Sequence, residues 1–183
     1  METIADFILD ITENSIRAKA SEITSSLSIQ SKTDTITLVV TDNGCGMDEE
    51  TLQKATEPFY TTKTTRKIGL GLPFLKWAAH QAGGTFEIQS TKQEGTKVCA
   101  TFQLSHIDCP PLGHLPSSVL VLMIHQDMRQ FTFVLHVDDE EIVIKKSDLE
   151  TALYPFDLRE SRFLVAIRDY IEESMKRPLG GRL

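Results

Sequence analysis

The chain has 183 residues, of which 40 % are hydrophobic and 25 % are charged, and its formal net charge is −7. This composition is typical of a globular protein that buries one core, or one core with a small appendage, and it excludes disordered and collagen-like chains. Because the charge is negative and Lys and Arg are not clustered, a nucleic-acid partner is not expected. The absence of a long apolar run argues against a membrane-embedded segment.

The cysteines indicate a reducing environment. Cys45, Cys99 and Cys109 are odd in number, lack the spacing of metal ligands and are not preceded by a signal peptide. We therefore expect a cytoplasmic protein. The sequence starts at Met1 just before the first predicted helix, so we expect that any signal reaches the chain through a protein partner.

The first predicted helix covers residues 4–18 and has one broad apolar face. Asp10, Asn14 and Arg17 are spaced by four and then three positions, which stacks them along another side of the helix. All three could therefore line one pocket.

Two strands with alternating apolar residues are predicted next, over residues 21–30 and 35–42. Asp42 continues the inward-facing row of the second strand. A carboxylate at such a position is costly unless it is hydrogen-bonded internally or reserved for a ligand, and the sequence leaves both readings open.

The rest of this half is predicted to complete a sheet covered by helices. A short helix over 48–55 precedes a polar segment, 58–67, that we interpret as a mobile lid, and a helix over 69–82 follows. A hairpin with strands 85–91 and 96–104 ends the unit. Helices on one face of a mostly antiparallel sheet predict a two-layer α/β sandwich, which is an α+β fold, over residues 1–106.

Residues 107–116 are predicted to be a linker, because Pro110, Pro111, Gly113 and Pro116 interrupt periodic structure. Residues 117–183 are predicted to form a small α+β domain of unknown role. Its expected elements are strands over 117–125, 130–137 and 140–145, followed by two helices that start near Ser147 and Asp157 with capping-box spacing.

Three glycine-containing motifs follow the first helix. Asp42 is followed by Gly44 and Gly46, which would let the backbone approach a flat ligand, although such a run is more often a plain turn. The run Gly69-Leu70-Gly71-Leu72 opens a helix whose free amides and dipole favour phosphate. Gly95-Thr96 alone indicates a hairpin turn. Each motif by itself is weak evidence for a binding site. Their order after Asp10, Asn14 and Arg17 makes that evidence stronger.

Taken together, these motifs resemble the successive boxes of the superfamily that unites gyrase, heat-shock ATPase chaperones, histidine kinases and mismatch-repair ATPases (GHKL). The matching runs are Asp10-Ile-Thr-Glu-Asn14, Asp42-Asn-Gly-Cys-Gly-Met47, Glu57-Pro-Phe-Tyr-Thr-Thr-Lys63, Gly69-Leu-Gly-Leu72 and Gly95-Thr96. The third run and its short distance to Gly69 are most similar to histidine-kinase catalytic domains. The mismatch-repair branch, which the first two runs also echo, would need a long lid and a second domain for which the chain has no room. The resemblance implies the two-layer sandwich of the Bergerat ATP-binding type.

The resemblance also implies roles for individual residues. Asp42 would accept a hydrogen bond from the adenine amino group, and Asn14 would hold Mg²⁺ between the phosphates. Asp10 would be the catalytic residue, although it is one methylene shorter than the glutamate that hydrolysing members carry. The full set expected to bind the nucleotide comprises Asn14, Arg17, Asp42, Gly44, Gly46, Met47, Lys63, Gly69, Leu70, Gly71, Leu72 and Thr96.

The sequence contains no phosphoacceptor site of its own, because the histidines lack the flanking pattern of such a site and the helical pair that carries it is missing. The leading hypothesis is therefore a kinase module that binds ATP and Mg²⁺ and transfers the γ-phosphoryl group to a partner protein in trans. The alternatives are an ATP-gated regulatory binding module without transfer and an anti-sigma-type serine kinase.

Overall fold

The protein is described here by a computed structural model that covers residues 3–57 and 71–180. Twelve helices and strands follow one another along these residues, namely α1 (Ile4–Arg17), β1 (Glu22–Gln30), β2 (Thr35–Asp42), α2 (Glu49–Lys54), α3 (Gly71–Gln81), β3 (Phe86–Thr91), β4 (Gly95–Gln103), α4 (Leu115–Met123), β5 (Gln130–Val137), β6 (Glu140–Lys145), α5 (Lys146–Leu153) and α6 (Ser161–Leu179).

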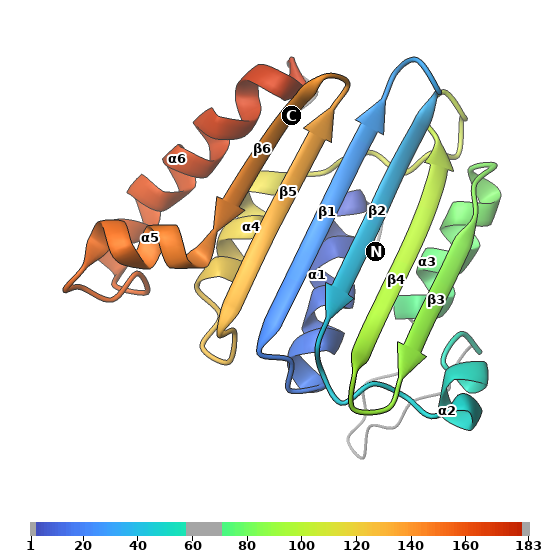
Figure 1. Cartoon of the computed structure of the whole chain (residues 1–183). Coiled ribbons are helices and arrows are strands. Elements are labelled where there is room, and N and C mark those ends of the chain that lie inside the picture. Colours follow the sequence, from blue (N-terminus) through green and yellow to red (C-terminus); the bar gives the residue numbers. More distant parts are fainter. Residues whose placement is uncertain (1–2, 58–70, 181–183) are drawn as a thin grey trace.

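One sheet of six strands organises the molecule, in the order β3-β4-β2-β1-β5-β6. Neighbouring strands are antiparallel except for β1 and β5, which are parallel. Helices α1, α3 and α4 lie behind the sheet in Figure 1, and α6 packs against α4 at the β6 end. The fold is thus the predicted two-layer α+β sandwich.

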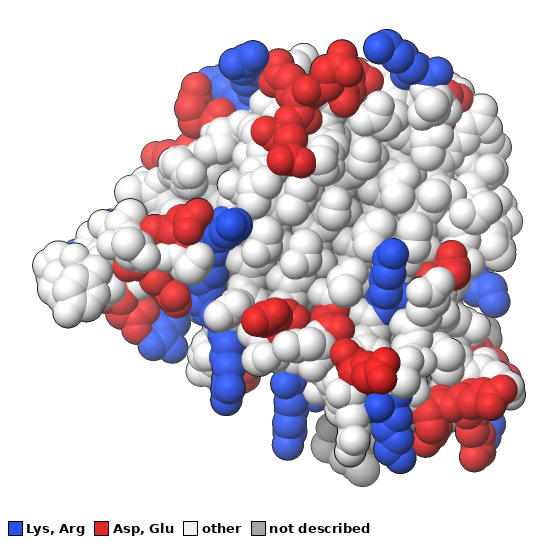
Figure 2. Space-filling model, in the orientation of Figure 1, with Lys and Arg blue, Asp and Glu red and all other residues white. Residues whose placement is uncertain are grey.

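The outer face of the sheet is turned toward the viewer in Figure 2, which shows it as a largely uncharged surface with acidic and basic side chains toward its margins. Its strands alternate accordingly, with apolar side chains toward the helices and mostly Ser, Thr and Val outward. The buried core therefore lies in the single layer between sheet and helices.

Helix α1 is the central element of that layer. Its N-terminus has a capping box, in which the Thr3 hydroxyl accepts a hydrogen bond from the Asp6 amide and the Asp6 side chain accepts one from the Thr3 amide. The buried positions Ile4, Phe7 and Ile8 lie on the core-facing side of the helix. The other side of α1 remains available for polar residues, as its periodicity predicts.

The strand predicted over 117–125 is wrong, because these residues belong mainly to helix α4 (Leu115–Met123). The run is so uniformly apolar that it carries neither a two-residue nor a 3.6-residue period. His114 accepts a hydrogen bond from the Ser117 amide at the helix start, and Pro116 fits the first turn. Packing of α4 against both α1 and α6 then favours the helix.

The C-terminal elements are of the α+β kind expected, but they share the sheet and the core of the first half. Strand β5 pairs with β1 along its whole length, and the hydrophobic cluster contains residues from both halves. The expected linker, 107–116, is hydrogen-bonded to the start of α1, where Ile4 and Ala5 donate to the carbonyls of Pro111 and Leu112. It joins parts of one layer and does not lead to a separately packed sheet.

The starts of the last two helices differ from the expected capping boxes. Helix α5 begins at Lys146 without a side-chain cap among the described residues, and α6 begins at Ser161, four residues after Asp157. The second box is half formed, because the Asp157 amide donates to Glu160 Oε1 at 3.2 Å. The sequence pattern therefore located these helices to within a turn.

Candidate functional site

Asp42 lies at the end of β2, beneath helix α1, and its carboxylate is held from two sides. Ser15 Oγ donates to Asp42 Oδ2 at 2.5 Å, and the Gly44 amide donates to Asp42 Oδ1 at 2.8 Å. A carboxylate has about four lone-pair positions, so these two bonds orient the group and leave acceptor capacity for a further donor. Internal hydrogen bonding and ligand binding, the two readings left open by the sequence, are compatible here.

The loop that follows Asp42 is fixed by its neighbours in the fold. The Cys45 amide donates to the Ala18 carbonyl at the end of α1 at 2.9 Å, and the Gln93 amide donates to the Cys45 carbonyl at 2.7 Å. Asn43 Oδ1 accepts bonds from the amides of Ser21 and Glu22, each at 2.9 Å. The loop therefore joins α1 to the β3–β4 hairpin and keeps a defined shape.

The glycines of this loop are required by contacts within the chain. A Cβ atom on Gly44 would lie 2.8 Å from the Ala18 Cβ, and one on Gly46 would lie 1.9 Å from the Thr91 carbonyl oxygen. Gly46 also has a φ of 58°, which favours glycine. Close packing inside the protein accounts for both residues, and room for a ligand is not needed to explain them.

Thr96 lies beside Asp42, because the two residues are paired across β2 and β4. The Thr96 hydroxyl is 2.8 Å from Ser90 Oγ, which also accepts from the Met47 amide at 2.9 Å. Asp42, Met47 and Thr96 are therefore brought into one hydrogen-bonded region, together with the glycine loop. Ser90, which the sequence analysis did not select, connects them.

Asn14 and Arg17 are neighbours on the last turns of α1, as their spacing predicts. Arg17 Nη1 donates to Asn14 Oδ1 at 3.2 Å, and Arg17 Nη2 forms an ion pair with Glu13 at 2.7 Å. Arg17 is exposed, so this pair contributes little stability and can reorganise around another anion.

Asp10 lies against the first residue of α3. A Cβ atom built on Gly71 would be 1.6 Å from Asp10 Oδ2, so the carboxylate occupies the space beside the helix N-terminus. A negative charge at that end of a helix is favourable. Leu72 is partly buried against the core in the same turn. Lys63, Gly69 and Leu70 lie outside the described residues, as does the whole of segment 58–67, which was expected to be a lid.

Two serines in the site were missed by the sequence analysis. Ser15 is only 3 % exposed and falls on the buried stripe of α1 with Ile8 and Ile11. A small hydroxyl that interrupts an apolar stripe was a usable signal. Ser90 had no comparable signal, because its partners come together only through the pairing of β3 with β4.

The described residues contain no cluster of three or more His, Cys, Asp or Glu side chains that could hold a metal ion. Within the same ranges, no helix has the length and apolar character needed to cross a bilayer.

Comparison with known proteins agrees with this architecture. The solved structure of the N-terminal domain of a DNA repair protein superposes with a TM-score of 0.53 over 79 % of this chain and 52 % of that one, at 14 % sequence identity. This likeness concerns the fold alone. Its coverage exceeds that of the sequence relatives described next.

Sequence comparison defines the family. Residues 2–106 match the family described as histidine kinase-, DNA gyrase B- and HSP90-like ATPase, and the chain belongs to this family. It is 39 % identical over 113 residues to the sensor protein kinase FleS of Pseudomonas aeruginosa, covering 61 % of this chain and 27 % of the relative. It is 34 % identical over 104 residues to a putative NtrY-like sensor histidine kinase of Rickettsia conorii, covering 55 % of this chain and 16 % of the relative.

The chain thus spans about a quarter or less of the length of these relatives, by the coverages of 27 % and 16 %. What the match establishes is a histidine-kinase-type ATP-binding domain.

Proposed function

We propose that the protein binds MgATP at the region around Asp42 and α1 and transfers the γ-phosphoryl group to a protein partner in trans. The observation that carries the proposal is the orientation of the Asp42 carboxylate by Ser15 and Gly44 in a chain of the ATPase family. A pre-oriented acceptor of this kind suits the amino group of adenine, because a hydrogen bond to a charged group contributes about 1.5–3 kcal/mol. The three unpaired cysteines fit the cytoplasmic setting that we include in the proposal.

The donor set near α1 fits Mg²⁺ bound chiefly through phosphate. Asn14 Oδ1 is a neutral oxygen ligand of the type that hard cations accept, and Arg17 beside it can move to a phosphate oxygen. Because the described residues offer no carboxylate cluster, the remaining ligands would be phosphate oxygens and water. Bound Mg²⁺ would neutralise charge on the transferred group. Lys63 and the amides of Gly69 to Leu72 would complete the phosphate contacts in this proposal.

The proposal is tested by incubating the protein with γ-labelled ATP and the products of neighbouring genes. Label on a partner His or Asp supports the proposed transfer, and label on a partner Ser would identify a serine kinase. Complete absence of labelled partner would overturn the transfer step.

One observation favours a second candidate, an ATP-gated binding module without transfer. The Asp10 carboxylate lies against Gly71, so its role could be to hold the start of α3. In that case nucleotide-dependent partner binding would be measured without any transferred label.

The variants Asp10→Asn and Asn14→Ala separate these candidates. Asparagine can still cap a helix N-terminus, so Asp10→Asn should preserve MgATP affinity while slowing transfer by about 10²–10⁴-fold if Asp10 acts as a base. Asn14→Ala should weaken MgATP binding and transfer together. Calorimetric titration and turnover measurements on both variants check this prediction, and unchanged turnover for Asp10→Asn would remove Asp10 from catalysis.

A further inference from the structure

A pocket lies between the end of α1 and the turn that joins α4 to β5. Its volume is about 720 Å³, and its charged walls come from Glu13, Arg17 and Lys19 on one side and Asp127 and Arg129 on the other. Arg17 is shared with the proposed phosphate contacts, because it also bonds to Asn14. The pocket therefore adjoins the proposed reaction site.

The pocket is locally basic in a chain whose net charge is −7. Arg17 is already paired with Glu13 at 2.7 Å. Lys19 and Arg129 form no ion pair with any described residue, and Asp127 is the remaining carboxylate in the wall. Lys19 and Arg129 thus add two positive charges to the pocket wall against the one negative charge of Asp127, which favours a ligand that carries negative charge.

The backbone of Lys19 supplies an independent observation. Lys19 has a φ of 58°, in the left-handed region where helices usually end on glycine. A side chain with a Cβ atom is disfavoured there. Glycine would adopt this backbone conformation with less strain than lysine. The lysine side chain at the rim of the pocket therefore calls for a functional explanation.

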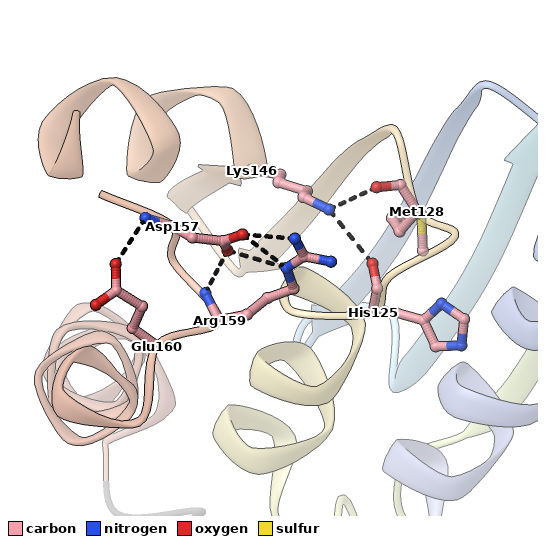
Figure 3. Close-up of polar contacts among 6 residues, drawn as sticks. All are labelled: His125, Met128, Lys146, Asp157, Arg159 and Glu160. Carbon is pink, nitrogen blue, oxygen red and sulfur yellow. Dashed lines mark hydrogen bonds and ion pairs between the residues drawn. The ribbon is translucent and has the colours of Figure 1, made fainter. Parts of the chain in front are cut away.

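The opposite wall is held rigid by a buried lysine. Figure 3 shows Lys146 donating to the carbonyls of His125 and Met128, and Lys146 is only 6 % exposed. Burial lowers the pKa of Lys146. These bonds fix the turn that carries Arg129, which belongs to the part of the chain beyond the family match at residue 106.

We infer that this pocket docks an acidic segment of a protein partner, with its carboxylates paired to Lys19 and Arg129. The inference rests on the proposed function, which requires a partner to approach α1. An extended peptide suits the pocket better than phosphate does, because the walls include the apolar Ile16 and Ala20 and two carboxylates. Those carboxylates repel a compact dianion more strongly than they repel separated single charges.

The test is the binding of a fluorescein-labelled hexaglutamate peptide to the whole chain, followed by fluorescence polarisation. We expect Lys19→Gly and Arg129→Gln each to weaken binding roughly fivefold, as is typical of single rim charges, and we expect added salt to weaken binding to the parent protein. Lys97→Gln, at an exposed position of β4, is the matched control and should leave the affinity unchanged. A hexalysine peptide should not bind in the pocket.

Lys19→Gly carries a second readout. Because glycine relieves the left-handed backbone, this variant should have a higher melting temperature while binding the acidic peptide more weakly. Equal peptide affinity in the parent, Lys19→Gly and Arg129→Gln proteins would overturn the inference, as would displacement of the peptide by millimolar inorganic phosphate through the same two residues.

MgATP affinity measured in the same variants keeps the two proposals distinguishable, because Lys19 and Arg129 are not among the nucleotide contacts. Peptide docking without any phosphoryl transfer would leave the docking site standing and refute the kinase function. Normal phosphoryl transfer that does not depend on Lys19 or Arg129 would support the kinase function and refute the docking site.

Discussion

At the scale of single residues, the site is organised by short-range hydrogen bonds to Asp42. One comes from α1 through Ser15 and the other from the following loop through Gly44. Because these donors belong to different elements, the position of α1 over the sheet sets the direction in which the carboxylate points. We therefore predict that the proposed ATP binding at Asp42 depends on Ser15 as well as on Asp42 itself.

Asp42→Ala should weaken ATP binding by roughly 10- to 150-fold, because the hydrogen bond to the charged acceptor that it removes contributes about 1.5–3 kcal/mol. Ser15→Ala should weaken ATP binding by a smaller factor, about fivefold, because the carboxylate keeps its bond from Gly44 but loses its fixed direction. Calorimetric titration measures both effects. Thr41→Ala, at the exposed position next to Asp42, is the control, and equal affinity in a folded Asp42→Ala protein would refute the assignment.

Asp157 offers a test of the C-terminal region by pH. A hydrogen bond from the Arg159 side chain lowers the pKa of Asp157 from 3.8 to about 2. A depressed folded-state pKa stabilises the protein above pH 3.8, and that contribution is lost as pH falls toward about 2. Urea unfolding should show Asp157→Asn to be less stable than the parent at pH 5 and equally stable near pH 2. A difference that stays constant over this range would contradict the pairing.

The sequence predicted where the candidate site residues lie when their placement depends on local spacing. Asp10, Asn14 and Arg17 follow from helical periodicity, and Asp42 follows from strand parity, so each lies on the element expected for it. Ser90 could not be found this way, because its contacts with Met47 and Thr96 require the register of β3 and β4.

At the scale of elements, α4 is the clearest case in which the sequence alone predicted the wrong secondary structure. The run Val119 to Met123 is apolar on every side, and strand and helix then differ only in what surrounds them. Its surroundings are α1 and α6, which offer two apolar helical surfaces. Amphipathic elements such as α1 and α6 carry their own period, and the sequence therefore placed the end of α1 to within one residue and the start of α6 to within about one turn.

The contact between α1 and α3 can be tested through Gly71. Alanine normally stabilises a helix interior by about 1 kcal/mol relative to glycine. At this position its Cβ atom would lie 1.6 Å from Asp10 Oδ2, so the flexible Asp10 side chain must rotate away from α3, and Gly71→Ala should therefore stabilise the protein by clearly less than this value. Urea unfolding measures the change, and Gln81→Ala, at an exposed position in α3, is the control.

A double-mutant cycle makes the same test specific to the contact. Asp10→Ala removes the carboxylate, so Gly71→Ala should stabilise the Asp10→Ala protein more than it stabilises the parent, with a coupling of up to about 1 kcal/mol. Additive effects would show that the two residues do not touch.

At the scale of the whole molecule, the sheet joins the halves that the sequence had divided at residues 107–116. The parallel pairing of β1 with β5 joins the four strands of the first half to the two strands of the second half in one sheet. Parallel pairing of distant strands leaves no local pattern in the sequence, which is why the composition of the connecting segment suggested a domain boundary. The shared core implies that neither half buries its apolar surface alone.

This continuity predicts a single cooperative unfolding transition. The chain has one tryptophan, Trp77 on α3, which reports on the first half. The variant Trp77→Phe/Tyr170→Trp moves that reporter to α6. Urea midpoints from the two tryptophan positions and from far-ultraviolet circular dichroism should coincide, because disrupting β1 removes the partner of β5 and exposes the core on both sides. Trp77→Phe alone, measured by circular dichroism, controls for the substitution itself. Separated midpoints for Trp77 and Tyr170→Trp would instead show that residues 117–183 unfold as the independent domain predicted from the sequence.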